Sequence, residues 1–277
     1  MSGAIWLASY PRSGNTWTRM ALYSLQNDGA ELDFKAFAGF GPMASGRDQI
    51  DRALEIDTGL MTQNELEELR PDSYAVLYGD DRPPQLSKVH DAWFRTPNGR
   101  PVFDRAFTHA AIYLIRDPRD VAVSWARFLN WPIDRAIAFL CARDATLGST
   151  GGIGIQLQQS VGTWSDHAAS WIDESGLDPL VVRYEDQLAD PAEALRRMAA
   201  HIGWEAPENT VARAVEVTRF DQLATKERRA GFVELGQRAE RFFHTGKSGT
   251  WRSILTPEQA ATLEREHGPM MERFGYL

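Results

Sequence analysis

The chain contains very little cysteine and no long apolar segment. Its 277 residues include a single cysteine, Cys141, which excludes an intramolecular disulfide framework. No apolar run approaches the roughly 20 residues that a membrane-spanning helix needs, and no basic region precedes an apolar stretch at the N-terminus. No cluster of His and Cys has zinc-like spacing. We therefore expect a soluble, cytoplasmic protein with no membrane span and no bound metal.

Positive charge is also scarce. The chain has 30 Lys and Arg against 38 Asp and Glu, which gives a formal net charge of −8. This balance argues against a general binder of nucleic acid or of anionic membranes, although a local basic pocket for a nucleotide is compatible with it. The length and a hydrophobic fraction of 43% fit one sizeable globular domain or two small ones. We expect a single domain spanning residues 1–277, and we leave a homodimer open.

Short apolar runs alternate with helical patterns along the chain. Strands are predicted at four such runs, residues 4–9, 86–90, 111–115 and 180–183. Helix starts are indicated by the pattern over residues 16–27, by the capping-box spacing of Thr62 and Glu65, and by Asp117-Pro118, Asp190-Pro191 and Thr256-Pro257. This alternation predicts an α/β fold, a central and mostly parallel sheet flanked by helices on both faces. Ligands of such sheets lie beyond the carboxyl ends of the strands.

The segment after the first predicted strand is suited to binding an anion. It begins at position 10 and reads Tyr-Pro-Arg-Ser-Gly-Asn-Thr-Trp. The free N–H groups of a helix N-terminus favour a phosphate, and Arg12, Ser13 and Thr16 can supply further donors. The segment is not a Walker A loop, because Gly14 is its only glycine and Asn15 stands where the Walker lysine would be. A capped helix with a surface arginine would explain this segment taken alone.

Residues 116–124 form a second predicted strand end that feeds a helix. Arg116 lies at the strand's edge, and Ser124 lies about two turns into the helix, on the same side as Asp117 and Asp120. This arrangement predicts a second anion site. A capped helix with solvated arginines is the alternative.

Lys88 and His90 share one face of an extended segment, because strand side chains alternate. An imidazole with a pKa near 6.5 can accept a hydroxyl proton at neutral pH, and a neighbouring ammonium disfavours the imidazolium. The pair therefore suits acid–base chemistry, with a hydrogen-bonded surface histidine as the alternative. Four other histidines match no such element, and we expect them to be structural: His109, His167, His201 and His267.

Taken in order, these segments resemble the motifs of sulfotransferases that use 3′-phosphoadenosine 5′-phosphosulfate (PAPS). The first resembles the family's phosphosulfate loop, Tyr-Pro-Lys-Ser-Gly-Thr-Thr-Trp, and residues 116–124 resemble its 3′-phosphate motif. Leu-Ser-Lys-Val-His resembles the family's Lys-x-His element. Further on, the chain carries Tyr-Glu-Asp, Thr-x-Phe and Gly-x-x-Gly-x-Trp. The glycine-rich insert, Gly162-Thr163-Trp164-Ser165 and the following helix with Trp171 resemble bacterial small-molecule sulfotransferases.

The resemblance implies a sulfotransferase fold with a P-loop-like turn, PAPS as co-substrate, and a hydroxylated small molecule as acceptor. His90 would be the general base, with Lys88 and Arg12 at the transferring group. The resemblance assigns the remaining site residues to the nucleotide: Ser13, Gly14, Asn15 and Thr16 to its phosphates, Arg116 and Ser124 to the 3′-phosphate, Trp17, Tyr184, Thr218 and Phe220 to the adenine, and Gly246 and Lys247 to the C-terminal anion loop.

The chain departs from the family pattern at two places. Arg12 replaces the loop lysine, so it keeps the charge but cannot act as a general acid. The family's C-terminal Arg-Lys pair is His244-Thr245 here. Each charge-assisted hydrogen bond lost would remove about 1.5–3 kcal/mol, unless Arg241 or Lys247 substitutes. Two other functions stay open at this point: a catalytically silent nucleotide-binding module and a nucleotide-dependent phosphotransferase.

The acceptor is not identified by the sequence. Five side chains are candidates for lining its pocket, although scattered apolar and aromatic residues are more often core: Phe40, Met43, Trp93, Phe94 and Trp131. The glycine-rich residues 147–162 are either a lid over the site or a plain surface connection.

Overall fold

The computed structural model describes residues 2–79, 82–148, 155–235 and 240–277. The backbone separates into two compact units. Unit 1 comprises Met1–Tyr10, Gly41–Tyr113 and Arg143–Val181, and unit 2 comprises Pro11–Phe40, Leu114–Ala142 and Val182–Leu277. The prediction of a single domain over residues 1–277 stays a prediction.

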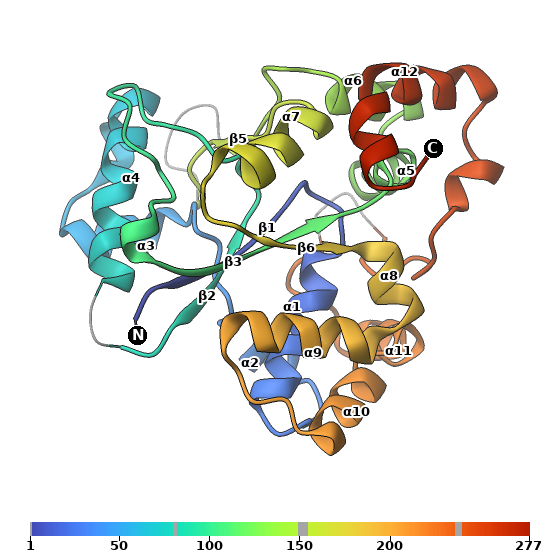
Figure 1. Cartoon of the computed structure of the whole chain (residues 1–277), viewed down its shortest axis with the longest axis horizontal. Coiled ribbons are helices and arrows are strands. Elements are labelled where there is room, and N and C mark those ends of the chain that lie inside the picture. The colour runs from blue at the N-terminus through green and yellow to red at the C-terminus, as the bar shows by residue number, and fades with distance from the viewer. Residues whose placement is uncertain (1, 80–81, 149–154, 236–239) are drawn as a thin grey trace. The chain divides into compact units, whose positions relative to one another are not determined.

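The main sheet has four strands in the order β2-β1-β3-β6 (Figure 1). Their bounds are Ala4–Ser9 for β1, Gln85–Val89 for β2, Thr108–Ile115 for β3 and Leu180–Arg183 for β6. β1 and β2 are parallel, with Ala4 opposite Gln85 and Ala8 opposite Val89. All six residues of β1 are buried, which explains their apolar composition, since an inner strand of a parallel sheet is covered on both faces. The predicted α/β fold with a parallel sheet flanked by helices is confirmed.

Unit 1 packs its helices around aromatic side chains. Its helices are α3 Arg47–Leu54, α4 Gln63–Tyr78 and α7 Trp164–Ala169, which continues into a π-helical turn, Ser170–Glu174. Short 3₁₀ turns cover Thr58–Leu60 and Arg105–Phe107, and β4 Thr146–Leu147 pairs antiparallel with β5 Gln159–Ser160. The Thr62 and Glu65 capping box is confirmed. Trp6 of β1 packs against Tyr74 and Phe103 at 5.3 and 5.1 Å between ring centres.

Unit 2 is mostly helical. Its elements are α1 Asn15–Gln26, α2 Phe34–Phe37, α5 Pro118–Leu129, α6 Ile133–Leu140, α8 Tyr184–Ala189, α9 Pro191–Ile202, α10 Glu208–Val217, α11 Phe220–Ala230, the 3₁₀ turn Thr250–Ser253 and α12 Pro257–Arg273. The predicted caps Asp117, Asp190 and Thr256 are confirmed, since each side chain accepts a backbone N–H of its helix. Tyr184 directly follows β6 and begins the short helix α8, which the sequence did not predict.

The predicted lid segment falls partly outside the described residues, at 149–154. Its described part is packed within unit 1. Arg47 donates its backbone N–H to Ile155 at 3.0 Å, and Leu157 donates to Ser45 at 2.8 Å. Leu157 is buried. Residues 155–162 therefore belong to the framework of unit 1.

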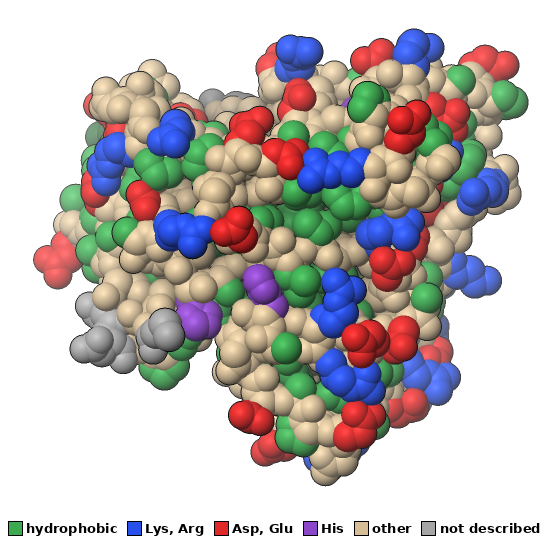
Figure 2. Space-filling model, in the orientation of Figure 1, with side chains coloured by type: hydrophobic (Ala, Val, Ile, Leu, Met, Phe, Trp, Pro, Cys, Tyr) green, Lys and Arg blue, Asp and Glu red, His purple; other side chains and the backbone are tan. Residues whose placement is uncertain are grey.

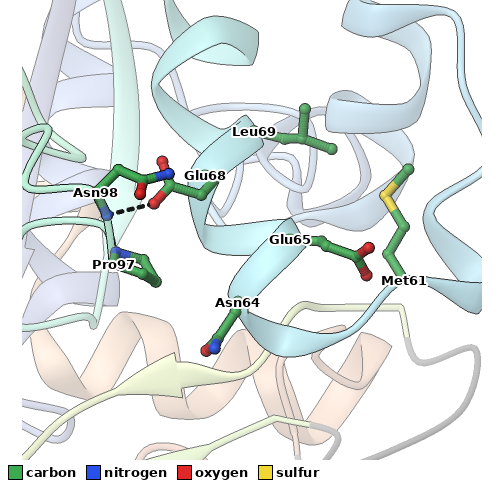
Figure 3. A pocket seen from close by; sticks show the side chains of 7 residues that line it. All are labelled: Met61, Asn64, Glu65, Glu68, Leu69, Pro97 and Asn98. Atoms are coloured by element: carbon green, nitrogen blue, oxygen red, sulfur yellow. Dashed lines mark hydrogen bonds between the residues drawn. The ribbon is translucent and has the colours of Figure 1, made fainter.

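The face shown in Figure 2 mixes acidic and basic side chains and has no single basic patch. In the part of the chain that the structure describes, no helix is long and apolar enough to cross a membrane. A pocket of about 460 Å³ in unit 1 lies against the first turns of α4, where Glu68 accepts the backbone N–H of Asn98 at 2.6 Å (Figure 3). Its lining contains no predicted site residue: Met61, Asn64, Glu65, Glu68, Leu69, Pro97 and Asn98.

Candidate functional site

The predicted phosphate loop is a tight turn between β1 and α1. Arg12 and Gly14 both have positive φ, at 75° and 100°. A Cβ at position 14 would lie 2.8 Å from the Tyr184 ring, so only glycine fits beneath that ring. The Ser13 hydroxyl is buried and has no hydrogen-bond partner among the described residues. The turn thus presents an unmatched donor next to the N-terminus of α1.

The Arg12 side chain joins the two predicted anion motifs. Its Nε donates to the Ser124 hydroxyl at 3.0 Å, and its guanidinium lies over the rings of Phe128 and Phe242 at 4.3 and 5.1 Å. Burial, together with the nearby Arg116, lowers the pKa of Arg12 to about 10. Arg12 therefore stays charged at neutral pH while held by aromatic faces.

Arg116 connects three segments that the sequence predicted separately. It donates to the backbone oxygens of Arg12 at 3.2 Å and of Lys247 at 3.1 Å, and it lies over the Tyr184 ring at 4.2 Å. Its Nε is buried and has no hydrogen-bond partner in the described chain. An anion that accepts from this nitrogen would satisfy it, because an unmatched buried donor is costly.

Asp120 is a site residue to which the sequence analysis assigned no role. Its carboxylate accepts the backbone N–H groups of Gly249 at 2.5 Å and Trp251 at 3.0 Å, and the Thr250 hydroxyl at 2.9 Å. It therefore holds the C-terminal glycine loop against α5. The signal was its place as the second aspartate of Arg-Asp-Pro-Arg-Asp, but the partner lies about 130 residues away and no local pattern reveals it.

The four predicted adenine-binding residues lie together with the loop in unit 2. The Trp17 and Tyr184 rings meet edge to face at 5.9 Å, and Trp17 donates its indole N–H to the Thr218 carbonyl at 3.0 Å. The Thr218 hydroxyl donates back to its own helix, α10. Phe220 packs so closely on Gly246 that a Cβ there would lie 2.4 Å from the ring.

His244 and Thr245 stand where the resemblance places an Arg-Lys pair, and arginines from other segments lie within electrostatic range of His244. Partial burial, followed by Arg127, Arg12 and Arg241, lowers the pKa of His244, so this histidine is neutral at neutral pH. These three arginines therefore lie within electrostatic range of His244, the position where the resemblance places a cation. Arg127, one turn beyond Ser124 on α5, is another residue that the sequence analysis missed. Lys247 is exposed and contributes its backbone carbonyl to Arg116.

His90 lies in unit 1, directly after β2, and is half-buried. Its Nδ1 is 3.0 Å from the carbonyl oxygen of Ser9, the last residue of β1. A carbonyl oxygen only accepts, so this hydrogen bond requires the proton on Nδ1. The neutral ring then carries its basic lone pair on Nε2, which is the form a general base needs.

Lys88 precedes His90 on β2 and is also half-buried. Its backbone is bonded to the segment beside it, with N–H donation to Pro42 and carbonyl acceptance from Ala44, both at 2.9 Å. Met43, a candidate acceptor-pocket residue, is therefore next to Lys88. Trp93 is buried and donates to the Phe103 carbonyl at 3.1 Å, so it belongs to the core. Of the other candidates, Phe94 lies in unit 1 and Phe40 and Trp131 lie in unit 2.

His167 is held behind the backbone of His90. Tyr113 is 2.9 Å from its Nδ1, and its Nε2 is 3.2 Å from the His90 carbonyl oxygen. Because that carbonyl accepts, Nε2 carries the proton and Nδ1 accepts from the Tyr113 hydroxyl. Burial lowers the pKa of His167 to about 4, so the ring stays neutral.

The chain is an α/β protein whose clustered arginines in unit 2 form a candidate anion site at a strand-to-helix turn. Residues 108–275 match the model of the sulfotransferase domain. The chain belongs to the sulfotransferase domain family, and the predicted enzyme class is confirmed.

Two similar sequences match nearly the whole chain. Cytosolic sulfotransferase 16 of Arabidopsis thaliana is 25% identical over 97% of this chain and 75% of its own length. Sulfotransferase 1A1 of Canis lupus familiaris is 24% identical over 97% of this chain and 83% of its own length.

Two solved structures support the fold. Mouse sulfotransferase SULT7A1 complexed with PAP superposes with a TM-score of 0.61 at 20% identity, covering 97% of this chain and 84% of that chain. Retinol dehydratase in a complex with retinol and PAP gives 0.62 at 21% identity, covering 97% of this chain and 81% of that chain.

Proposed function

We propose that this protein transfers a sulfuryl group from PAPS to the hydroxyl of a small-molecule acceptor. The observation that carries the proposal is the convergence of Arg12, Arg116 and the Ser124 hydroxyl on one turn of unit 2. Three solved structures of similar fold contain PAP, one of a mouse sulfotransferase and two of retinol dehydratase, and the latter two also contain androsterone or retinol. These ligands support a nucleotide site and a small acceptor in this chain.

The residues of unit 2 fit such a nucleotide. Ser13 and Arg116 each keep a buried donor that is unmatched within the described chain. Gly14 leaves room at the N-terminus of α1, and Arg12 supplies a permanent charge. The phosphate groups of such a nucleotide match these side chains, since each phosphate offers several acceptor oxygens and negative charge.

The mechanism assigned to these residues is an in-line displacement. PAPS supplies a sulfuryl group attached to a phosphate that can leave with the bond's electron pair. His90 Nε2 removes the acceptor's hydroxyl proton while that oxygen forms its bond to sulfur. Arg12 stabilises the charge on the departing phosphate, and Lys88 steadies the transferring group. Positioning and fixed positive charge supply most of the catalysis, as in phosphoryl transfer.

Turnover separates this function from a silent nucleotide-binding module. Incubating the protein with labelled PAPS and a panel of hydroxylated metabolites is expected to give a labelled product with at least one of them. Tight nucleotide binding with no product from any member of a broad panel would favour the silent module. A Mg²⁺-dependent transfer of phosphate instead of sulfate would support the phosphotransferase.

Replacing Arg12 by lysine is expected to weaken nucleotide binding. Lysine keeps the charge but loses the hydrogen bond to Ser124 and the planar contact with Phe128 and Phe242. We expect the Kd for adenosine 3′,5′-bisphosphate to rise roughly tenfold, the effect of about one charge-assisted hydrogen bond. Calorimetry measures this Kd. The control is Arg219→Lys, which alters an exposed arginine that pairs with Asp221 in unit 2. An unchanged Kd would remove Arg12 from the nucleotide site.

Location and assembly are inferred from the family. Several relatives are named cytosolic sulfotransferases, and we infer a cytoplasmic location for this chain as well. A homodimer stays a prediction, as does the closer kinship with bacterial natural-product enzymes.

A further inference from the structure

Four consecutive residues after β2, His90 to Trp93, are each held by a hydrogen bond from elsewhere in unit 1. Their donors and acceptors come from β1, α4, β5, α7 and the π-helical turn. The strongest of these contacts is an ion pair between Arg70 and Asp91. We propose that Arg70 and Asp91 are positioning residues that hold His90 in the orientation a general base needs. This inference rests on the proposed role of His90.

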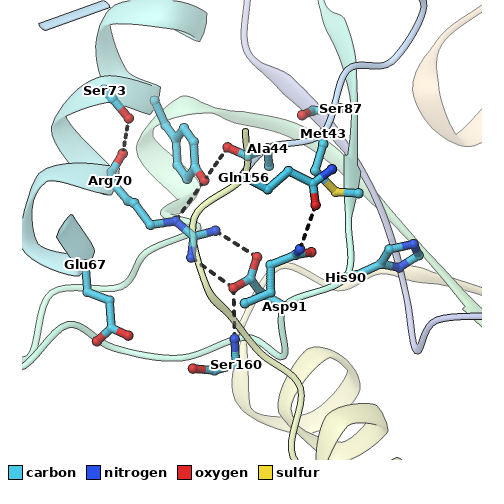
Figure 4. Close-up of polar contacts among 12 residues, drawn as sticks. Met43, Ala44, Glu67, Arg70, Ser73, Ser87, His90, Asp91, Gln156 and Ser160 are labelled. Atoms are coloured by element: carbon cyan, nitrogen blue, oxygen red, sulfur yellow. Dashed lines mark hydrogen bonds and ion pairs between the residues drawn. The ribbon is translucent and has the colours of Figure 1, made fainter. Parts of the chain in front are cut away.

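The ion pair is fully buried and bidentate. Arg70 lies on α4, and its two terminal nitrogens meet the two oxygens of Asp91 at 2.9 and 2.8 Å (Figure 4). Each side chain is only 1% exposed. Arg70 is fixed from its other side as well, since its Nε donates to the Tyr74 hydroxyl at 3.0 Å. Two parallel bonds fix both the position and the plane of the carboxylate.

Asp91 transfers this rigidity to the main chain beside His90. Its carbonyl accepts the Trp171 indole N–H at 2.9 Å, and its Oδ1 lies 3.3 Å from the backbone nitrogen of Ser160. Ala92 donates its N–H to the Ser160 carbonyl at 2.7 Å. The residue that follows His90 therefore has no freedom to move along or across the strand direction.

The base depends on that fixed backbone. The His90 ring contacts Ser9 from this main-chain position, with Nδ1 3.0 Å from the carbonyl oxygen and 3.3 Å from the hydroxyl, and the bond to the carbonyl sets the tautomer. A buried ion pair is often no more stabilising than an apolar pair of similar size. We therefore infer that the Arg70 and Asp91 pair serves to orient His90. An apolar pair of similar size at these positions is expected to keep the protein folded, so it shows the effect on the orientation of His90 separately from any effect on stability.

The test reads the His90 ring directly. Long-range ¹⁵N–¹H spectra of the histidine rings report which nitrogen carries the proton, and the wild type is expected to show His90 as a single Nδ1–H tautomer. The double variant Arg70→Met with Asp91→Leu is expected to remain folded and to show His90 as a tautomer mixture. His90→Gln assigns the signal. The matched control is Arg100→Met with Asp72→Leu, which removes an exposed ion pair between Asp72 of α4 and Arg100.

Kinetics supply the second readout. With an acceptor from the panel, the double variant is expected to lose roughly tenfold or more in kcat while the Kd for adenosine 3′,5′-bisphosphate is unchanged. If the double variant fails to fold, Arg70→Lys takes its place, since lysine keeps the charge but lacks the planar guanidinium with two parallel donors. This variant is also expected to lower kcat and to show His90 as a tautomer mixture. A single Nδ1–H tautomer in folded variants would overturn the inference. Because the spectra need no turnover, absence of transfer in the wild type would refute the function and not this inference.

A separate observation concerns the phosphate loop. Thr16, which the sequence assigned to the nucleotide phosphates, donates its hydroxyl to the Glu234 carboxylate at 2.7 Å. The same carboxylate forms an ion pair with Arg19 at 2.5 Å, and the side chains of Arg19 and Glu234 are 3% and 22% exposed. A negative group thus lies on a donor of the anion loop, within electrostatic range of Arg12.

We further propose that Glu234 is an internal anion that competes with the nucleotide for Thr16. A phosphate that accepts from the Thr16 hydroxyl must displace the carboxylate or lie beside it, and like charges at short range repel. The nucleotide then binds to the phosphate loop more weakly than it would without the Glu234 carboxylate. Glu234 follows the end of α11, two residues after the buried Phe232.

Calorimetry with adenosine 3′,5′-bisphosphate tests the competition. Glu234→Gln is expected to tighten the Kd roughly tenfold, since one negative charge beside the phosphates is removed. Glu234→Asp, whose side chain is shorter, is also expected to lower this Kd. It replaces the glutamine variant if that variant does not fold. Glu272→Gln removes an exposed carboxylate of α12 as the control. An unchanged or weaker Kd overturns the competition, whereas no binding by any form, wild type included, would refute the proposed function instead.

Discussion

Replacing His90 by alanine abolishes sulfuryl transfer and leaves nucleotide affinity unchanged. The imidazole is expected to contribute a factor of about 10²–10⁴ to kcat as a general base. Nucleotide binding is expected to survive, because the cationic groups assigned to the nucleotide lie in unit 2 and His90 lies in unit 1. Turnover of labelled PAPS with the best acceptor measures the first quantity, and calorimetry measures the second.

A second histidine provides the comparison for this experiment. His201→Ala removes an exposed imidazole at the end of α9 and is expected to change neither quantity. A His90→Ala variant that loses transfer and nucleotide binding in parallel would show a structural role for His90. Full activity in that variant would leave the reaction without its assigned base.

Replacing Arg116 by methionine removes most of the nucleotide affinity. Arg116 offers a buried unmatched donor and also ties the phosphate loop to the C-terminal glycine loop through two carbonyls. Loss of its charge-assisted bonds, at about 1.5–3 kcal/mol each, is expected to weaken the Kd for adenosine 3′,5′-bisphosphate roughly a hundredfold. Methionine preserves much of the packing on Tyr184, so the protein is expected to stay folded.

Thermal unfolding and calorimetry on the same samples check this expectation. The control is Arg196→Met, which removes an exposed arginine paired with Glu208 in unit 2. A folded Arg116→Met protein with wild-type affinity would exclude Arg116 from the nucleotide site. Arg116→Lys is expected to recover part of the affinity, because it keeps the charge without the fork.

The framework was predictable where local chemistry determines it. β1 and β6 match the predicted runs, and for β1 the reason is that a strand buried on both faces is a continuous apolar run. The caps at Asp117, Asp190 and Thr256 were predictable because a capping side chain bonds to its own helix a few residues on. The short helix α8 that begins at Tyr184 was not predicted, since nothing in Tyr-Glu-Asp distinguishes a loop after a strand from the first turn of a short helix.

The contacts that complete the candidate site were not predictable from local pattern. Asp120 bonds to the loop at Gly249, and Glu234 bonds to Thr16 about 218 residues away. Such pairs depend on how distant segments meet, and charged residues occur on every exposed surface. Likewise, no local pattern distinguishes Arg70 from other helix arginines, and only the structure shows that it pairs with Asp91.

The central claim is that unit 2 binds the nucleotide of a sulfuryl donor. Calorimetric titration of the wild-type protein with adenosine 3′,5′-bisphosphate tests it most directly, with adenosine 5′-monophosphate as the comparison that lacks the 3′-phosphate. We expect saturable binding at one site per chain, with weaker binding of the monophosphate because Arg116 and its neighbours lose their ligand. Absence of binding by adenosine 3′,5′-bisphosphate, or equal affinity for the two compounds, would contradict it.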